Sequence, residues 1–525
     1  MANIKNLYIY GFKKFEEISV SFNEKMNIIV GENEAGKSTI LEAIKIVINQ
    51  LYKNVDKSIL KDLFNKQQVE NFKKNPCVEK LPKILIEIDL NLGAKEKNSE
   101  YFFGENNRNK KEDYGIKFEC SFNEEIGDGI LDVINKGNIP YEYYNLIWIT
   151  YSKQQYYLIK KPLNFISINT FENDNNSSFN YYNKALFNSM YSEKERMDSK
   201  TKFRSGLNRI FDEINLEKID KNRKFGINDK KIILETILSV YEDSISLENK
   251  GSGMSSLIKT QIALDKSKNH LDVILMEEPE NHLSYTTLNK MLAEIENREQ
   301  DSQIIIATHN NLIASRLNLQ NVIWINDNKS KSLNDISKKD AKFFVKADNN
   351  NFLQMLLSKK SILVEGATEF LLLPKLYEQM TGKKMEEDEV SIISCNGISF
   401  SHYLNVMKNT NKKIAVITDN DKKQSKIDFA KNFNNHNNNQ HIFMSDDIEQ
   451  GWTWEACFHA LNKELLDELI KVEEKAEYSF NNENYDKVLG KIFNNKVDTA
   501  YKMLISEKKF KVPKYIQDAI EWLRK

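Results

Sequence analysis

Short apolar runs separated by turns open the chain. Apolar residues concentrate at positions 7–10, 18–22 and 26–30, and each run has the length of a buried strand. The third run leads into a glycine-containing loop and then into residues 39–48, whose apolar positions recur with helical spacing. This pattern predicts three strands followed by a loop and a helix.

Six further apolar runs predict strands at residues 84–90, 116–120, 146–150, 273–276, 304–307 and 322–325. From about residue 155 to residue 245 the pattern changes, because Asn-rich sequence gives way to apolar residues at helical spacing, such as Leu207, Ile210 and Phe211. We interpret residues 156–245 as an insertion with mainly helical structure. It is either a dimerisation element or a helical lobe without a partner.

A second alternation of strands and helices follows the polar segment 326–342. Residues 362–364, 390–394 and 414–418 predict strands, and residues 369–379 predict a helix. The remainder has helical spacing, ending with 515–523, and the Asn/His-rich stretch 432–440 predicts a loop. The predicted boundaries are 1–155 and 246–342 for two parts of one domain, 156–245 for the insertion, and 343–525 for a second domain.

Composition narrows the classes of protein. The 525 residues, 40% of them hydrophobic, are enough for several domains with their own cores. Lys and Arg total 75 against 76 Asp and Glu, so any binding to nucleic acid must depend on a local patch. Neither a membrane span nor the apolar core of a secretion signal is visible, and the four cysteines form no CxxC pair. We therefore expect a cytoplasmic protein with no membrane partner and no structural zinc site.

Residues 31–38, GENEAGKS, fit the phosphate-binding pattern GxxxxGK[ST] at every fixed position. The motif follows a predicted strand and opens a predicted helix, which is the context that it requires. Lys37 would neutralise the β- and γ-phosphates, and the Ser38 hydroxyl would bind Mg²⁺. The sequence therefore predicts ATP as a cofactor, and we also assign Asn33, Gly36 and Thr39 to the nucleotide site.

Two later strands carry residues that suit the same site. The run at 272–276 ends in Glu277 and Glu278, which are candidates for the Mg²⁺ ligand and for the base that positions the attacking water. The strand at 304–307 delivers His309, a candidate sensor of the γ-phosphate. Together with the P-loop, these residues predict a nucleotide-hydrolysing site.

This order of motifs resembles the ABC-type ATPases of the SMC/RecF/Rad50 group. The opening IYGFKKF is similar to that group's first strand, which implies that Lys13 approaches the nucleotide. The sequence GSGMSS at 251–256 resembles the signature loop, which implies that Ser252 and Gly253 contact ATP bound by the opposite subunit of a dimer. SMC-type proteins usually have Asp-Glu at the acidic strand end, whereas EEPENHL here is similar to the OLD family.

A second acidic pattern lies in the C-terminal part. Residues 362–369, ILVEGATE, place Glu365 at a strand end and Glu369 at a helix start, and IAVITDND places Asp419 and Asp421 after a later strand. Carboxyl ends of parallel strands share one edge of a sheet, so these groups can converge on one or two Mg²⁺ or Mn²⁺ ions. This combination of strands and acids resembles the TOPRIM domain.

An ATPase followed by a TOPRIM unit in one chain resembles the OLD (overcoming lysogenization defect) family nucleases, including the nuclease subunit of Gabija anti-phage systems. The resemblance implies an α/β fold: an ABC-type, SMC/RecF-like ATPase domain split by a mainly helical insertion, then a C-terminal TOPRIM domain. It implies metal ligands at Glu365, Glu369, Asp419 and Asp421, of which Glu365, Asp419 and Asp421 are also the catalytic acids. Residues 453–456, TWEA, resemble the segment that carries a later acid.

The same resemblance implies Glu455 as a fifth metal ligand and a catalytic lysine in the C-terminal helical part. We assign this lysine to Lys496, and the lysine cluster at 508–514 remains the alternative.

Three functions remain open. The first is an ATP-regulated, Mg²⁺- or Mn²⁺-dependent DNA endonuclease in bacterial anti-phage defence, working as a homodimer or tetramer through the ATPase and the insertion. Resemblance to Gabija systems implies a UvrD-like helicase partner and inhibition by nucleotide, although the spacing of motifs does not say whether ATP activates or inhibits. The others are a RecF-like DNA-repair clamp with a TOPRIM scaffold, and an ATP-sensing subunit that controls a partner effector.

Overall fold

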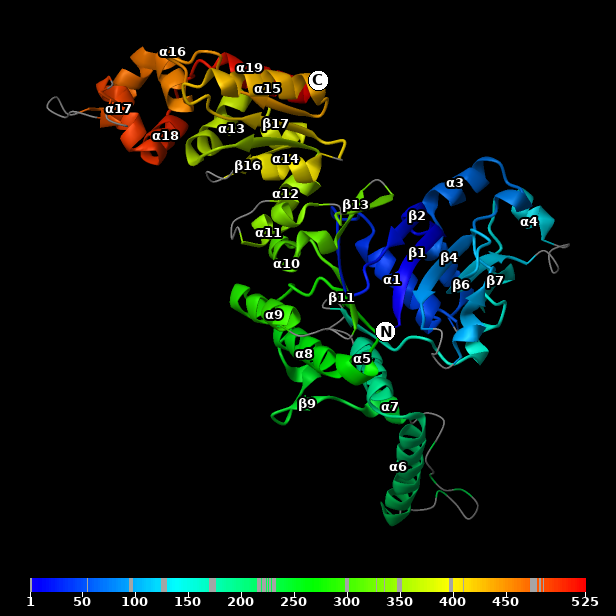
Figure 1. Cartoon of the computed structure of the whole chain (residues 1–525). Coiled ribbons are helices and arrows are strands. Elements are labelled where there is room, and N and C mark those ends of the chain that lie inside the picture. Colours follow the sequence, from blue (N-terminus) through cyan, green and yellow to red (C-terminus); the bar gives the residue numbers. More distant parts are fainter. Residues whose placement is uncertain are drawn as a thin grey trace. The chain divides into compact units, whose positions relative to one another are not determined.

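Two compact units make up the computed structural model, Met1–Asp335 and Ile336–Lys525 (Figure 1). The described residues are all except 1, 54, 94–97, 124–129, 170–175, 215–218, 220–222, 224, 226–227, 229–232, 298–301, 327, 335, 347–351, 396–399, 409, 473–478, 481–482 and 485. Among the described helices, none is both long enough and apolar enough to cross a membrane.

The first unit contains an antiparallel sheet with strand order β2-β1-β4-β6-β5, and β7 also pairs with β6. Its strands are β1 (Asn3–Phe12), β2 (Phe15–Ser21), β4 (Ile84–Asn91), β5 (Phe103–Gly104), β6 (Asp113–Phe122) and β7 (Tyr144–Thr150). Alternate residues of β1 and β4 are buried, which is the pattern of a sheet with one face on the core.

A second sheet of this unit has the order β14-β13-β3-β12-β11-β8, and all its neighbouring strands are parallel except β13 and β14. Its strands are β3 (Met26–Val30), β8 (Phe165–Asn169), β11 (Val273–Glu277), β12 (Gln303–Ala307), β13 (Val322–Asn326) and β14 (Lys329–Ser332). Residues of β11 and β12 are buried throughout, as expected for parallel strands covered on both faces.

Helix α1 (Lys37–Asn49) packs on both sheets and joins them into one hydrophobic core. Its sequence is apolar on nearly every side, which is typical of a buried helix. The indole Nε1 of Trp148 donates to the carbonyl of Ile46 (2.8 Å), and the hydroxyl of Tyr156 donates to the carbonyl of Ile48 (2.9 Å). These bonds satisfy carbonyls in the last turn of α1, where a helix leaves acceptors unpaired.

Helices of the first unit lie mainly after β8. They are α2 (Leu60–Leu63), α3 (Lys66–Lys74), α4 (Leu131–Asn135), α5 (Asn176–Met190), α6 (Glu193–Ile214), α7 (Leu234–Ile237), α8 (Ser252–His270), α9 (Tyr285–Asn297) and α10 (Asn311–Arg316). Strands β9 (Tyr241–Glu242) and β10 (Ile245–Ser246) form a hairpin with a two-residue turn.

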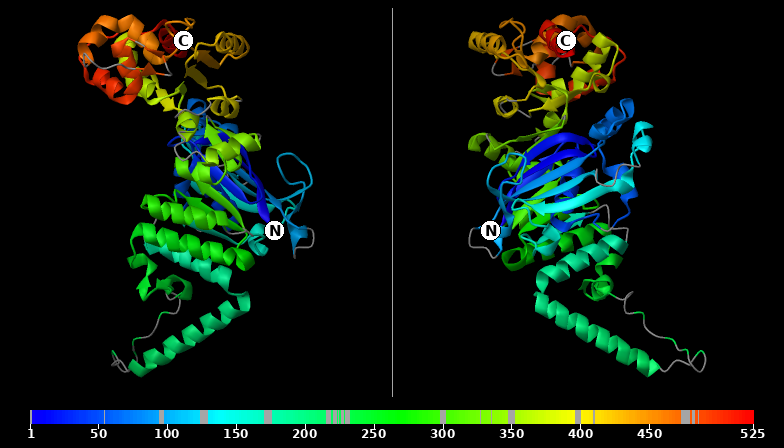
Figure 2. Two further views of the ribbon diagram at one scale, coloured as in Figure 1. Left: turned by 60° about the vertical axis from the view of Figure 1, so that its left-hand side comes forward. Right: turned by 90° about the vertical axis from the view of Figure 1, so that its right-hand side faces the viewer.

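The predicted insertion is only partly separate from the sheets. Strand β8 falls within residues 156–245, yet it pairs in parallel with β11 at the edge of the second sheet. The helical prediction for this segment agrees with α5 and α6, and Figure 2 shows α6 extending away from the two sheets of its unit. The second sheet therefore includes residues up to Asn169 before the helical part begins.

The second unit is built on a parallel sheet of order β16-β15-β17-β18. Its strands are β15 (Lys360–Val364), β16 (Val390–Ser394), β17 (Lys413–Ile417) and β18 (Gln440–Phe443). Its helices are α11 (Lys338–Lys346), α12 (Phe352–Leu357), α13 (Ala367–Thr381), α14 (Ser401–Met407), α15 (Gln424–His436), α16 (Trp454–Leu469), α17 (Lys487–Asn494), α18 (Lys496–Ile505) and α19 (Lys514–Arg524). A small hairpin joins β19 (Ser479–Phe480) and β20 (Glu483–Asn484).

One sequence prediction is wrong in detail, and one segment without a predicted element contains a strand. The stretch 432–440 is not a loop, because α15 continues to His436 and β18 begins at Gln440. The side chain of Asn434 accepts from the Ile442 amide (2.7 Å) and donates to the Ile442 carbonyl (2.8 Å), so an Asn that favours loops here bonds the helix to the edge strand. The polar segment after residue 325 likewise forms β14, which is antiparallel to β13.

Candidate functional site

The P-loop connects β3 to α1 and is shaped by its glycines. Gly36 has φ of 99°, and a Cβ at this position would lie 2.3 Å from the ring of Phe15, so only glycine fits. The Nζ of Lys37 donates to the carbonyls of Gly31 (3.0 Å) and Glu32 (3.2 Å). Burial lowers the pKa of Lys37, and the nearby carboxylates, Glu278 first among them, oppose this effect.

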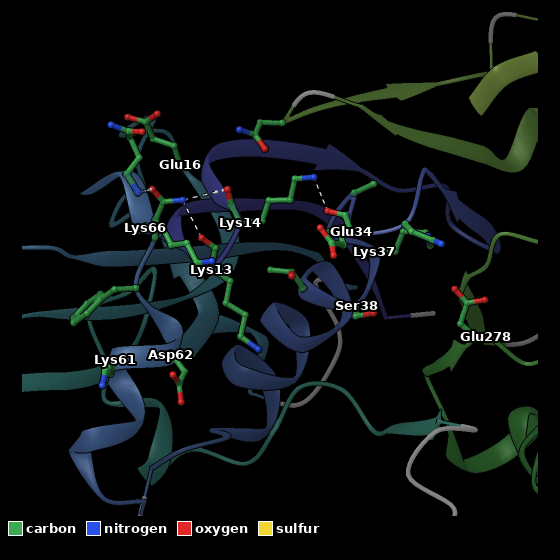
Figure 3. A pocket seen from close by; sticks show the side chains of 18 residues that line it. Lys13, Lys14, Glu16, Glu34, Lys37, Ser38, Lys61, Asp62, Lys66 and Glu278 are labelled. Carbon is green, nitrogen blue, oxygen red and sulfur yellow. Dashed lines mark hydrogen bonds between the residues drawn. The ribbon is translucent and has the colours of Figure 1, made fainter. Parts of the chain in front are cut away.

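A cavity of about 1130 Å³ opens over the P-loop. All six residues predicted for the N-terminal part of the nucleotide site line it: Lys13, Asn33, Gly36, Lys37, Ser38 and Thr39. Figure 3 shows Lys37 and Ser38 at the start of α1 with Glu278 across from them. Lys13 pairs with Glu42, and the Nζ of Lys14 donates to the carbonyl of Glu34 (2.5 Å).

Sequence reasoning missed three further cations that line this cavity, Lys14, Lys61 and Lys66. Lys14 adjoins the basic motif of the first strand, so its position was a usable signal. Lys61 and Lys66 have no motif and reach the cavity only because α2 and α3 fold back beside the P-loop, where the Asn65 side chain donates to the carbonyls of Lys13 (2.9 Å) and Lys14 (3.1 Å). Five lysines and four acidic residues line this cavity, and its size fits a nucleoside triphosphate.

The acidic strand end lies beside this cavity because β11 and β12 are in register. Glu277 is opposite Ala307, and the amide of Glu278 donates to the carbonyl of Ala307 (2.8 Å). The Nδ1 of His309 lies 2.5 Å from Oε2 of Glu278. Glu277 turns to β8, where its Oε2 accepts from Asn169 (3.1 Å). The structure thus brings Glu278 and His309 together. Among the described residues that line the P-loop cavity, Glu278 is present, whereas Glu277 and His309 are not.

Glu280 is a buried acid that sequence reasoning did not assign. Its Oε1 accepts from the Thr308 hydroxyl (2.5 Å) and lies 3.8 Å from His309 Nδ1. Burial raises the pKa of Glu280 to about 7, and the neighbouring Glu278 adds to this rise. Glu278, Glu280 and His309 present ligand atoms within 4.8 Å of one another. The spacing Glu-Pro-Glu was the available signal, since residues two apart after a strand can face the same side.

The proposed signature residues lie at the start of α8. A Cβ on Gly253 would lie 2.3 Å from the carbonyl of His282, so the helix start packs directly on the backbone after the acidic motif. Neither Ser252 nor Gly253 is among the described residues that line the P-loop cavity. One chain therefore places its signature residues away from its own P-loop cavity.

In the second unit, strand register creates the acidic centre. Val364 of β15 is opposite Ile417 of β17, so the next residues, Glu365 and Thr418, lie side by side. The Thr418 hydroxyl donates to Oε2 of Glu365 (2.9 Å). Asp419 follows, and its Oδ1 accepts from the amide of Trp454 (2.8 Å) at the start of α16.

Glu369 and Glu455 complete a cluster of four carboxylates. Glu369 is buried in the first turn of α13, and Glu455 is buried in the first turn of α16. Burial raises the pKa of Glu369 to about 7, with further contributions from Glu455 and Glu365. Burial also raises the pKa of Asp419 well above its usual range, followed by the effects of Glu455, Glu369 and Glu365. The charges of Glu365, Glu369, Asp419 and Glu455 therefore act on one another, and we treat these four residues as one acidic cluster.

Lys496 supplies a cation to this cluster from the first turn of α18. Its Nζ lies 2.8 Å from Oε1 of Glu455. Burial disfavours its charge, but Glu455, Asp419 and Glu369 outweigh that cost and raise the pKa of Lys496. In the alternative cluster, Lys508 pairs with Glu468 and Lys514 pairs with Asp518. The contacts therefore favour Lys496 as the lysine of the site.

Asp421 is held differently from the other predicted ligands. Its side chain is about half-exposed and pairs with Lys426, and its amide donates to the carbonyl of Trp452 (3.1 Å). The buried Asn420 between the two aspartates braces this turn through Nδ2, which donates to the carbonyl of Ser445 (2.9 Å). Asn420 was missed because it looks like an ordinary turn residue in the sequence.

The four carboxylates fit a hard divalent cation. All donors are oxygens, which Mg²⁺ and Mn²⁺ prefer. Oε2 of Glu455 is buried and, within the part of the chain that the structure describes, has no hydrogen-bond partner. Four acids face one lysine, so a cation would relieve their repulsion. The candidates to hold it are Glu365, Glu369, Asp419 and Glu455, although within the described part of the chain no three of them present ligand atoms within 4.8 Å of one another.

Known protein families match both units. A model of the AAA ATPase domain matches residues 3–203, and a model of the overcoming lysogenization defect protein-like TOPRIM domain matches residues 356–421. The predicted α/β fold class is confirmed, with an ATPase domain followed by a C-terminal TOPRIM domain. The chain therefore combines an ATPase domain with an OLD-like TOPRIM domain.

Among curated proteins, the Retron Vc95 probable ATPase of Vibrio cholerae is 23% identical over 454 residues, covering 73% of this chain and 84% of the relative. The DNA replication and repair protein RecF of Clostridium acetobutylicum is 49% identical over 41 residues, which cover 8% of this chain and only 11% of the relative.

Solved structures similar to the chain include an SmcHead bound to the C-winged helix domain of ScpA, with 14% identity and a TM-score of 0.33. They also include the recombination mediator protein RecF with ATP, with 10% identity and a TM-score of 0.34. These similarities cover 63% of this chain and 97% and 99% of the respective structures.

Proposed function

We propose that the protein is an ATP-regulated DNA endonuclease that depends on a divalent metal ion and acts in bacterial anti-phage defence. The observation that carries this proposal is the cluster of Glu365, Glu369, Asp419 and Glu455 with Lys496 at the carboxyl edge of a parallel sheet. Glu369 and Glu455 are buried close to Asp419 and Glu365, and such an accumulation of acids would destabilise a domain that served only as a scaffold. The match to an OLD-like TOPRIM domain agrees with this reading.

Each residue of the acidic centre has a distinct role in this proposal. A bound Mg²⁺ or Mn²⁺ would activate water and stabilise charge on the phosphate oxygens. Glu365 and Asp419 would hold the metal, oriented by Thr418 and by the Trp454 amide. Lys496 would place its ammonium toward the phosphate while pairing with the buried carboxylate of Glu455. Asp421 lies at the rim of the site, and it would release Lys426 when it binds the metal ion.

ATP would bind at the P-loop, with Ser38 and Glu277 beside its Mg²⁺ and Glu278 as the base. His309 would orient Glu278, since their side chains lie 2.5 Å apart. Ser252 and Gly253 would contact the nucleotide of a second protomer, which makes at least a homodimer necessary. Exposed apolar residues of α6, such as Ile210 and Ile214, support assembly through the helical part.

The test is cleavage of supercoiled and linear DNA with Mg²⁺ or Mn²⁺, with and without ATP. Asp419→Asn keeps an oxygen that accepts from the Trp454 amide but removes the charge, and it should abolish cleavage. Asp428→Asn, an exposed position on α15, is the matched control. Cleavage by Asp419→Asn at the wild-type rate would refute the assignment. Lys37→Ala separates activation by ATP from inhibition.

A second candidate is an ATPase subunit that controls a partner effector, as favoured by the extended similarity to the retron ATPase. Purification from the native host distinguishes the two. ATP-dependent release of a bound partner, with no DNA cleavage under either metal, would favour the regulatory subunit. A Gabija-like system would instead supply a UvrD-like helicase as the partner.

A further inference from the structure

A second cavity of the first unit, about 810 Å³, shares no lining residue with the P-loop cavity. It is enclosed by the end of α1 and the residues just after it, by the start of β8, and by α5, α6 and α7. Its six cationic residues are Lys53, Lys160, Lys161, Lys184, Arg196 and Lys200. Its acidic residues are Glu193 and Glu235. The walls therefore carry a clear excess of positive charge.

Among the residues that the structure describes, ion pairs within the cavity do not account for this excess. Glu235 is buried and pairs with Lys200 at 2.5 Å, so one acid and one cation compensate each other. Lys161 donates to the neutral Oδ1 of Asn49 (2.7 Å), and Arg196 donates to the carbonyl (3.0 Å) and Oδ1 (3.2 Å) of Asn188. Neutral acceptors fix the direction of these cations without neutralising them.

Repulsion between the lysines of the cavity also indicates an excess of positive charge. Partial loss of hydration lowers the pKa of Lys161 to about 8, and the ammonium of Lys184 adds to the effect. The carboxyl end of α1 attracts cations, but a helix end provides only about half a unit of negative charge. That is much less than the excess on the cavity walls.

We propose that this cavity binds phosphate groups of a ligand separate from the ATP at the P-loop. Its volume fits a nucleotide-sized molecule, and Lys and Arg are the residues that bind phosphate. The phosphates belong either to a free phosphorylated molecule or to the backbone of DNA. Helix α1 runs from Lys37 of the P-loop to Asn49 of this cavity, so one buried helix connects the two phosphate sites.

The test uses the full chain carrying Lys37→Ala, so that phosphate binding at the P-loop is weakened. Labelling of lysines with an amine-reactive ester, read by mass spectrometry, is compared without ligand, with tripolyphosphate and with a short DNA duplex. Lys161 and Lys184 should be protected by at least one probe. Protection by tripolyphosphate alone identifies a free phosphorylated molecule, and protection by DNA identifies its backbone.

A second measurement is the affinity of the protecting probe. Adding Lys161→Ala with Lys184→Ala should weaken binding at least about tenfold, because two charge-assisted contacts are lost. Adding Lys73→Ala with Lys74→Ala, exposed at the end of α3, removes the same charge and should change binding little. Absence of protection by both probes, or equal affinity in the two double variants, overturns the proposal. Neither result depends on DNA cleavage.

Discussion

Neutralising Glu369 should stabilise the second unit when no divalent cation is bound. Its pKa of about 7, against the ordinary 4.5, corresponds to about 3 kcal/mol. The folded protein holds this proton more tightly than the unfolded chain does. Stability is therefore lost as pH rises from about 4.5 to about 7, and the full cost applies above that range. Glu369→Gln removes the charge at nearly constant volume.

Hydrogen exchange of peptides from β15 and β17, measured in the presence of a chelator, follows the stability of this sheet. At about pH 8, Glu369→Gln should slow the hydrogen exchange that requires opening of this sheet roughly 100-fold. Each tenfold change in the exchange rate corresponds to about 1.4 kcal/mol. At about pH 5, where Glu369 is largely protonated in the folded protein, the difference should be small. Glu378→Gln, exposed on the same helix, should match the wild type at both pH values.

Addition of Mg²⁺ or Mn²⁺ should make the wild type more stable than Glu369→Gln. A ligand that binds only the folded state stabilises it in proportion to the logarithm of its concentration over Kd, so the wild type gains more than Glu369→Gln. The reasoning is refuted if Glu369→Gln is no more stable than the wild type at high pH without metal. It is also refuted if the difference between them is the same at both pH values.

Three further substitutions test the remaining assignments. Lys37→Ala should weaken ATP binding at least about tenfold in calorimetry, because the buried ammonium beside the phosphates is lost. Gly253→Val places a side chain against a carbonyl that a Cβ would meet at 2.3 Å, so ATP-dependent dimerisation in ultracentrifugation should fail while ATP binding persists. Lys496→Ala leaves Glu455 buried without its cation and should reduce DNA cleavage about 100-fold or more, whereas Lys508→Ala should cleave normally.

Motifs that are contiguous in the chain could be predicted from the sequence. The P-loop is one example, because a strand, a glycine turn and a helix start shape the site locally, and all its predicted residues line one cavity. Glu365 and Asp419 are another, because parallel strands end at the same sheet edge whatever the intervening helices do. Local conformation and strand direction are enough in both cases.

Only the tertiary structure decided which distant side chains share a site. Glu455 and Lys496 lie on helices far along the chain from Asp419, and their meeting depends on how α18 packs on α13 and α17 and how α16 packs on α17. Asp421 resembles Asp419 in the sequence, yet it turns outward to Lys426 because Asn420 braces the bend between them. The cation-lined cavity at the end of α1 has no motif at all. Burial and long-range packing set these charges and distances, and short-range sequence patterns do not encode them.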